Sequence, residues 1–186
     1  MMRSKNFVKK GRPNEENEYS FVNGIVLIDV STKRFPDRYA VIDEEDFHKV
    51  IDGRGKWFAI KGSNTLYACR KQKEKMHIAV MGEKNGFVVD HIDWNGLNNR
   101  RSNLRHASCS QNQGNAPKRR KGTSRFKGVS WYTSANKWGA NIMGTKNGKR
   151  RYLGLFVSDI EAAKAYDQAA KELFGPFAVL NFPDAE

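Results

Sequence analysis

The chain has 186 residues, 39% of them hydrophobic, and a formal net charge of +13. This length suits one domain or a few small modules and excludes a large enzyme barrel. The two cysteines are too few for a disulfide framework or a cysteine-built zinc site. The sequence has no apolar run long enough to span a bilayer and opens on no signal-peptide pattern, so we expect an intracellular protein without a membrane partner.

The positive charge is concentrated in one part of the chain. Residues 94–158 hold 14 Lys and Arg and no Asp or Glu, whereas residues 1–93 have a net charge of +3 and residues 159–186 of −4. A surface without a polyanionic partner ordinarily mixes both signs, so this acid-free block predicts nucleic-acid binding. The basic residues do not alternate with apolar ones at helical spacing, which argues against a membrane surface.

The N-terminal part predicts a disordered basic tail followed by a small α+β module. Residues 1–19 are polar and charged, which is typical of a tail. A helix is predicted at 44–51, with Asp43 as its cap and Phe47, Val50 and Ile51 on its inner side. The acidic residues 44–46 are then interpreted as negative charge in the first turn of this helix and not as a metal-binding cluster. Strands are predicted at 24–30, 38–43, 56–61, 65–71 and 75–81.

Residues 88–115, VVDHIDWNGLNNRRSNLRHASCSQNQGN, carry the candidate chemistry. A carboxylate stands beside an imidazole, Asp90 and His91, and two Asn-rich clusters follow. Asp and Asn offer the oxygen ligands that Mg²⁺ or Mn²⁺ prefers, and a neutral imidazole can take a proton from water. Strands are predicted at 86–92 and 104–107, with a turn at Asn95-Gly96 and a helix over 108–115.

This segment resembles the HNH nuclease motif of phage and bacterial homing-type endonucleases. The resemblance implies a ββα-metal (His-Me finger) unit around one Mg²⁺ or Mn²⁺, without zinc. It implies that Asp90 and Asn112 bind the metal, that His91 is the general base, and that Asn103 holds the loop and orients His91. Neighbours on a regular strand face opposite sides. The strand must therefore end or bend at His91, or the scissile phosphate must lie between the two side chains.

Other polar residues around the motif have open or secondary roles. Arg100, Arg101 and Arg105 are predicted to neutralise phosphates. His106 is either a structural or a phosphate contact and fits the motif less well as a metal ligand. His77 is either a basic residue serving the site or a strand residue of a small core. A basic run in the linker is predicted to track the DNA backbone or enter the minor groove: Lys118, Arg119, Arg120 and Lys121.

Residues 125–183 predict a sheet covered by one helix. Ser158 and Glu161 form a capping box, and Gly175-Pro176 ends the helix. Small residues along the helix let it lie close against a sheet. In NKWGANIM (136–143), apolar and polar residues alternate, so one face packs on the helix and the other is left free.

This second segment resembles the plant apetala/ethylene-response-factor DNA-binding domain, through FKGVSWY, NKWGANIM, KRRYLGLF, IEAAKAYDQAAKELFG and AVLNFP in unbroken order. The resemblance implies a three-stranded antiparallel sheet with one packed α-helix, whose free face enters the major groove. It implies DNA contacts from Lys127, Ser130, Tyr132, Asn141, Met143, Lys149, Arg150 and Tyr152. The guanine-reading arginines of the plant pattern are absent at Ser130, Tyr132 and Met143, so the plant target sequence does not carry over.

Taken together, the sequence predicts an α+β protein that cuts double-stranded DNA. The predicted parts are a tail (1–19), an N-terminal module (20–82), an HNH unit (83–116), a basic linker (117–124) and a DNA-binding domain (125–183). The predicted function is a site-specific endonuclease of the homing type, a monomer or weak dimer on DNA, in the cytoplasm or nucleoid of a bacterial or phage-infected host. The alternative is a non-catalytic, sequence-specific DNA-binding regulator with a degenerate HNH scaffold.

Overall fold

The computed structural model describes residues 8–9, 16–71, 74–118, 122–143 and 149–183. The chain has a mixed α/β fold and divides into two compact units, Met1–His106 and Ala107–Glu186. The predicted boundaries at 82, 116 and 124 do not coincide with this division, which passes through the HNH-like segment. Among the described residues, no helix is long and apolar enough to cross a membrane.

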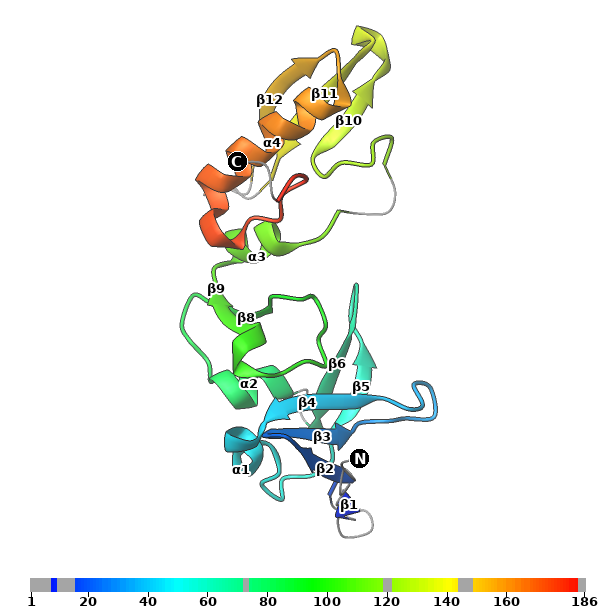
Figure 1. Cartoon of the computed structure of the whole chain (residues 1–186), viewed down its shortest axis with the longest axis vertical. Coiled ribbons are helices and arrows are strands. Elements are labelled where there is room, and N and C mark those ends of the chain that lie inside the picture. Colours follow the sequence, from blue (N-terminus) through cyan, green and yellow to red (C-terminus); the bar gives the residue numbers. More distant parts are fainter. Residues whose placement is uncertain (1–7, 10–15, 72–73, 119–121, 144–148, 184–186) are drawn as a thin grey trace, which may run out of the picture. The chain divides into compact units, whose positions relative to one another are not determined.

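The described residues of the first unit form three small sheets and two short helices, which can be followed in Figure 1. Four antiparallel strands follow one another in order: β1 (Val8–Lys9), β2 (Tyr19–Val22), β3 (Ile25–Asp29) and β4 (Tyr39–Asp43). A second sheet contains β5 (Phe58–Lys61), β6 (Leu66–Arg70) and β7 (Glu74–Lys75). The third pairs β8 (Val88–His91) with β9 (Leu104–Ala107). The helices are α1 (Phe47–Val50), preceded by a 3₁₀ turn at Glu44–Asp46, and α2 (Met76–Met81).

The core of this unit is built on β3 and β4, which correspond to the strands predicted at 24–30 and 38–43. Val26 and Ile28 on β3, and Ala40 and Ile42 on β4, are fully buried and alternate with less buried neighbours. Alternation of this kind is what one buried face of a sheet requires. The inner side predicted for the 44–51 helix is also confirmed, because its apolar residues pack against this core.

Two local predictions in this unit are wrong. Residues 75–81 were expected to form a strand, but most of them form the helix α2, in which Met76, His77 and Val80 are buried. Buried residues at positions i, i+1 and i+4 fit one face of a helix. A short apolar run can be a strand or a helix when only the sequence is known. Asp43 does not cap the following helix. Its carboxylate instead accepts hydrogen bonds from Arg100 Nε and the Arg101 amide, both at 2.8 Å.

The predicted tail is partly built into the fold. Residues 8–9 pair with β2 as β1, whereas residues 1–7 and 10–15 lie outside the described residues. Asn17 is only 5% exposed. It donates to the carbonyls of Asp29 and Trp57, at 2.6 and 2.7 Å, and accepts from the Trp57 amide at 2.7 Å. Asn17 thus ties the residues before β2 to the end of β3 and to the residue that precedes β5.

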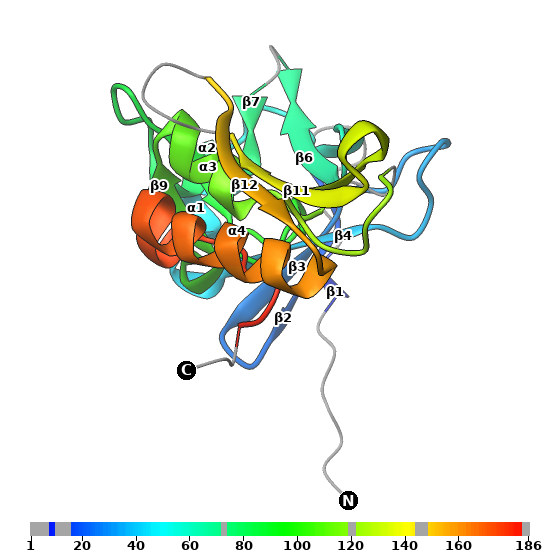
Figure 2. The ribbon, with the colours of Figure 1, turned by 90° about the horizontal axis from the view of Figure 1, so that it is seen from above.

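The second unit has the predicted sheet-and-helix architecture. After α3 (Cys109–Asn115), the strands β10 (Val129–Tyr132), β11 (Lys137–Ile142) and β12 (Arg151–Phe156) form an antiparallel sheet in that order. Figure 2 shows α4 (Asp159–Phe174) running along this sheet. A 3₁₀ turn, Gly175–Phe177, follows the helix.

Small residues let α4 approach the sheet closely, as predicted. Ala162, Ala163, Ala169 and Ala170 are buried against the sheet, and the expected capping box at the start of α4 is present. The helix-facing residues of β11 are every second one along the strand, because Trp138, Ala140 and Ile142 all pack in the core. The opposite face of the sheet carries polar residues and the buried Gly139.

Replacing Asn17 tests whether the residues before β2 belong to the fold. Asn17→Ala is expected to lower the free energy of unfolding by roughly 2–4 kcal/mol, because each buried group left without a partner costs about 1–3 kcal/mol. Urea denaturation of the full chain measures the change. The exposed Asn64→Ala is the matched control, expected to stay within about 0.5 kcal/mol of the wild type. Equal stabilities for the two variants would contradict this assignment.

Candidate functional site

The loop between β8 and β9 is held by the side chain of Asn103. Its Oδ1 accepts from the Asp93 amide at 3.0 Å, and its Nδ2 donates to Asp93 Oδ1 and to the Asn98 carbonyl, each at 2.8 Å. The Asp93 carboxylate also accepts from Asn98 Nδ2 and from the Asn95 amide, each at 2.8 Å. Burial acts to raise the pKa of Asp93, but these hydrogen bonds hold it below its usual value. One amide and one carboxylate therefore fix the path of the loop, the part predicted for Asn103.

His91 stands at the end of β8, and its ring is oriented by Asn99. His91 is 6% exposed and Asn99 is fully buried. Nε2 of His91 lies 3.3 Å from Asn99 Oδ1, while Asn99 Nδ2 donates to the Leu97 carbonyl at 3.1 Å. Because an amide oxygen only accepts, Nε2 carries the proton and Nδ1 keeps the lone pair. Burial lowers the pKa of His91 more than its hydrogen bond and the nearby carboxylates raise it, so the ring is neutral at pH 7.

This contact corrects the sequence analysis in one respect. Asn103 was expected to orient His91. Asn103 is turned toward the loop, and Asn99 reaches the imidazole instead. The Asn-Asn pair in the sequence does not say which amide points inward. Burial of Asn99 is a consequence of the loop's path, which only the structure provides.

A second histidine packs against His91. His77, on α2, is 5% exposed, and its ring centroid lies 4.8 Å from that of His91, with the rings perpendicular. Burial lowers the pKa of His77 to about 3, helped by His91. Within the described part of the chain its buried Nδ1 has no hydrogen-bond partner. Of the two interpretations left open for His77, burial supports the core residue. His77 lies on a helix and not on the expected strand, and its ring contacts that of the candidate base.

Asp90 and His91 contact different parts of the unit, as neighbours on a strand should. Asp90 is 7% exposed, and its Oδ2 lies 3.0 Å from Arg105 Nε on β9. His91 instead faces the loop and α2. Strand β8 ends at His91, which is one of the arrangements that the motif requires.

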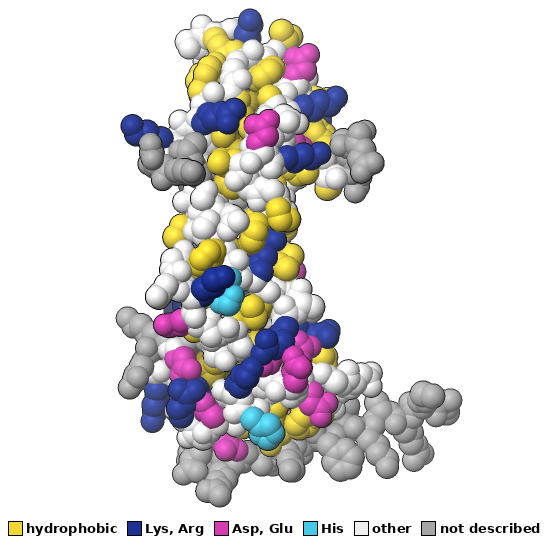
Figure 3. All heavy atoms as spheres, turned by 90° about the vertical axis from the view of Figure 1, so that its left-hand side faces the viewer, with side chains coloured by type: hydrophobic (Ala, Val, Ile, Leu, Met, Phe, Trp, Pro, Cys, Tyr) yellow, Lys and Arg dark blue, Asp and Glu magenta, His cyan; other side chains and the backbone are white. Residues whose placement is uncertain are grey.

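The arginines predicted to meet phosphates have carboxylate partners within the first unit. Arg100 pairs with Asp43 at 2.8 Å, and Arg101 pairs with the fully buried Asp46 at 2.7 Å. On the face drawn in Figure 3, basic and acidic side chains of this unit lie next to one another. Arg105 is engaged with Asp90. These pairs give all three guanidinium groups a structural role, and their contact with phosphate stays a prediction.

The remaining residues of the motif lie on β9 and α3. His106 Nε2 is 3.1 Å from the Gly82 carbonyl, a structural contact. Asn112 lies on α3, in the second unit, and its side chain is exposed. The helix begins at a capping box formed by Ser108 and Gln111. Sharing of a metal by Asp90 and Asn112 stays a prediction. Among the described residues, no group of three or more His, Cys, Asp or Glu is arranged to hold a metal.

The outer face of the second unit's sheet carries most of the residues predicted to meet DNA. Tyr152 and Met143 are 55% and 48% exposed. Asn141 is directly opposite Tyr152 in the register and donates to the Tyr132 hydroxyl at 3.2 Å. The side chains of three more predicted contacts are exposed: Ser130, Lys149 and Arg150. In the linker, Lys118 is half-buried, and Arg119, Arg120 and Lys121 lie outside the described residues.

Lys127 does not fit the phosphate contact predicted for it. Its Nζ donates to the Gly114 carbonyl at 2.7 Å and lies 5.8 Å from the centre of the Tyr166 ring. Burial lowers the pKa of Lys127 from 10.5 to about 8, although the charge of Asp167 acts to raise it. The amine is therefore directed into the unit, where it links the segment before β10 to α3.

Comparisons with known proteins agree with both resemblances. Residues 77–113 match the family model for HNH endonucleases, and residues 124–176 match that for the AP2 domain. The chain carries an HNH segment and an AP2 domain. An uncharacterized HNH endonuclease of Acanthamoeba polyphaga mimivirus is 41% identical over 93 residues, which cover 50% of this chain and 46% of that protein. Lys127, Asn141 and Tyr152 fall within the AP2 domain, and Asp90, His91 and Asn112 within the HNH segment.

The AP2 domain is also similar to plant proteins. Dehydration-responsive element-binding protein 2A of Arabidopsis thaliana is 50% identical over 50 residues, covering 27% of this chain and 15% of that protein. APETALA2-like protein 2 of Oryza sativa subsp. indica is 46% identical over 66 residues, covering 35% and 15%. The chain thus spans less than half the length of these relatives. No solved structure matches the chain.

The buried amine of the AP2 domain predicts a pH-dependent stability. Because folding lowers the pKa of Lys127, the folded state binds fewer protons than the unfolded state between about pH 8 and 10.5. The cost of burying the charge is therefore full below pH 8 and disappears as the pH rises. We expect the wild type to gain stability relative to Lys127→Met between pH 7 and about pH 10, measured by urea denaturation. For the exposed Lys137→Met the difference should stay constant, and a constant difference for Lys127→Met would contradict burial of the charge.

Proposed function

We propose that this protein is a metal-dependent DNA endonuclease whose HNH segment cuts the phosphodiester bond and whose AP2 domain selects the site. The observation that carries the proposal is a neutral, buried His91 beside the carboxylate of Asp90, at the end of a strand whose following loop is held by Asn103. Metal-assisted hydrolysis of a phosphodiester needs a general base to activate water and a ligand that binds a hard cation nearby.

In this proposal His91 removes a proton from the attacking water. The hydrogen bond to Asn99 leaves the lone pair on Nδ1, so Nδ1 is the accepting atom. Burial keeps the ring neutral before the reaction. After proton transfer the imidazolium is stabilised by the Asn99 oxygen and by the nearby carboxylates. Asn103 acts indirectly, because it fixes the loop that carries Asn99.

Asp90 and Asn112 would hold the divalent metal. A carboxylate and an amide are both hard oxygen donors, which suit Mg²⁺ or Mn²⁺ and not zinc. Mg²⁺ is ordinarily bound by one or two protein ligands and completed by water and phosphate oxygens, so two donors fit it. When bound, such an ion supplies positive charge to the phosphate and the departing 3′ oxygen. The Arg105 guanidinium, 3.0 Å from Asp90 Oδ2, holds that carboxylate in place.

The AP2 domain would bind double-stranded DNA through the outer face of β10–β12. A sheet of this width fits the major groove, and Arg150 and Lys149 stand exposed before β12 to meet phosphates. Ser130, Tyr132, Asn141, Met143 and Tyr152 would face the bases. Without the family's arginines at three of these positions, recognition would depend on amide, hydroxyl and apolar contacts rather than on bidentate guanine contacts.

The finer assignments extend this proposal. We infer a homing-type enzyme of a bacterial or phage mobile element, acting inside the cell where its DNA lies, as a monomer or weak dimer. The competing function is a DNA-binding regulator without catalysis, favoured by the similarity of the AP2 domain to plant proteins named for binding a dehydration-responsive element.

Removing the proposed base separates the two functions. With supercoiled plasmid, the wild type should nick or linearise DNA only when Mg²⁺ or Mn²⁺ is present. His91→Ala should lose cleavage by at least about 100-fold, because a general base contributes about 10²–10⁴-fold, and should keep its affinity for the same DNA. The exposed His48→Ala, on α1, is the matched control and should cut normally. Binding without cleavage by the wild type under every metal would support the regulator.

The salt dependence of binding tests the proposed DNA face. The logarithm of the binding constant should fall linearly with the logarithm of salt concentration, by about 0.9 for each phosphate contact. Arg150→Ala should make the measured slope less steep by about 0.9. Lys164→Ala, on the exposed side of α4, should leave the slope unchanged. Equal slopes for Arg150→Ala and the wild type would remove Arg150 from the interface.

A further inference from the structure

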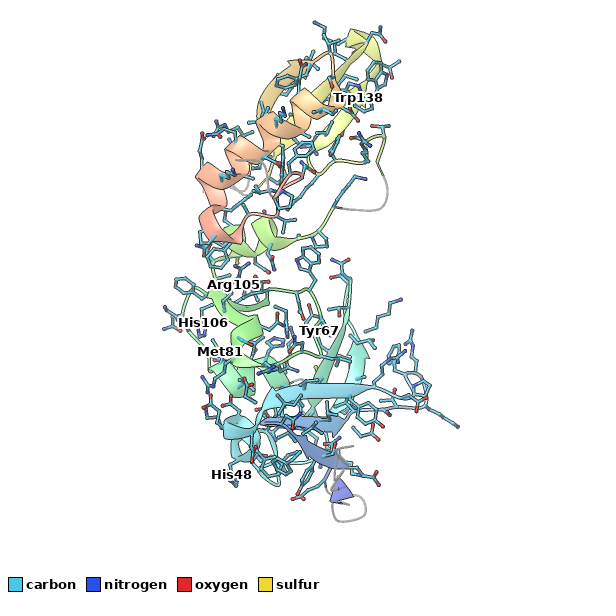
Figure 4. All side chains as sticks on the ribbon, in the orientation of Figure 1. His48, Tyr67, Met81, Arg105, His106 and Trp138 are labelled. Carbon is cyan, nitrogen blue, oxygen red and sulfur yellow. The ribbon has the colours of Figure 1, made fainter. Side chains whose placement is uncertain are left out.

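A tyrosine from the N-terminal module lies against the candidate base. Tyr67 is on β6, and its ring centroid lies 5.7 Å from that of His91 and 5.6 Å from that of His77. With the 4.8 Å contact between the two histidines, the three rings form one cluster from β6, α2 and β8. Figure 4 shows Tyr67 beside the loop that follows β8. Tyr67 precedes the HNH segment and belongs to no motif, so sequence alone does not connect it with that segment.

Two glycines fix the position of the Tyr67 ring. A Cβ atom at Gly96, in the loop after β8, would overlap the ring, and so would one at Gly62, before β6. Neither glycine has a positive φ, so close packing is what requires them: the Tyr67 ring at Gly62, and both this ring and the Leu66 carbonyl at Gly96. With the histidines on its other sides, the ring has little room to change its rotamer. Tyr67 is therefore held in a defined orientation relative to His91.

Among the described residues, the hydroxyl of Tyr67 makes no hydrogen bond, although a partly buried tyrosine ordinarily finds a partner for this group. Burial raises the pKa of Tyr67, and the negative charge of Asp90 raises it further. The group is therefore a protonated donor at neutral pH. The ring that carries this donor contacts the ring of the proposed base and lies within the electrostatic influence of the proposed metal ligand Asp90.

We propose that Tyr67 is a phosphate-contacting residue of the cleavage site, whose hydroxyl donates a hydrogen bond to a non-bridging oxygen of the scissile phosphate; this rests on the proposed function. Negative charge grows on these oxygens as water attacks, so a donor aimed at one of them favours the transition state over the bound substrate. The cluster of His77, Gly62 and Gly96 then keeps this donor in place and needs no chemical role of its own.

The test compares Tyr67→Phe with the wild type in single-turnover cleavage of a duplex whose site has been mapped from plasmid products. The ring and its packing remain in this variant, so its melting temperature and its affinity for the duplex should match those of the wild type. The rate should fall by about 10–100-fold, the range expected for a hydrogen bond to a charged group. Tyr39→Phe, on β4 and 52% exposed, is the matched control and should cut at the wild-type rate. A Tyr67→Phe rate within about twofold of the wild type overturns the inference.

A substrate with one sulfur at the scissile phosphate distinguishes a direct contact from a structural effect. Sulfur is a poor hydrogen-bond acceptor, so in one of the two phosphorothioate diastereomers the donor loses its partner. For that diastereomer the ratio of wild-type to Tyr67→Phe rates should fall toward one, while for the other it should stay as on normal DNA. The same ratio on both diastereomers means that the hydroxyl acts elsewhere.

The outcomes also separate this inference from the proposed function. A wild type that cuts nothing with any divalent metal removes both. A wild type that cuts, with His91→Ala inactive and Tyr67→Phe fully active, removes only the role of Tyr67.

Discussion

The hydrogen bonds of Asn103 are the constraint on which the candidate site depends. A loop of more than ten residues between two short strands has many alternative paths, and each ordered residue loses conformational freedom. One side chain links the Asp93 backbone and carboxylate to the Asn98 carbonyl and closes this loop upon itself. That closure carries Asn99 to the imidazole of His91 and Gly96 to the ring of Tyr67. The geometry of the site therefore depends on the loop after β8, which Asn103 closes, more than on the strand that carries His91.

Local signals in the sequence predict the elements whose physics is local. The alternation in β3 and β4, the capping box and alanines of α4, and the two-faced pattern of β11 were enough to give these elements and their packing. The HNH and AP2 resemblances rested on spacing as well as identity, and the family comparisons agree with both. The turn between β2 and β3 also has a local signal, because Asn23-Gly24 is a strong turn dipeptide and both residues have positive φ.

The roles of side chains that could not be predicted depend on contacts between segments that are distant in the sequence. Asn17 looked like tail, yet its buried hydrogen bonds join residues 12 and 40 positions away. Arg101 looked like a phosphate ligand, yet the fully buried Asp46 pairs with it across 55 positions. Lys127 matched a DNA-contact position, yet its amine donates to the carbonyl of Gly114, on the helix α3 that precedes the AP2 domain. In each case a polar side chain found a partner inside its own unit, which pattern and composition cannot show.

The central proposal is that Asp90 and Asn112 bind the divalent ion that would serve cleavage. It is tested most directly by adding Mn²⁺ to the complex of the His91→Ala protein with its DNA and measuring paramagnetic broadening of assigned NMR signals. The account predicts that the signals of Asp90 and Asn112 broaden together at low Mn²⁺, ahead of the exposed acidic residues such as Glu44 and Glu45. Broadening confined to those exposed carboxylates, with Asp90 and Asn112 unaffected, would contradict it.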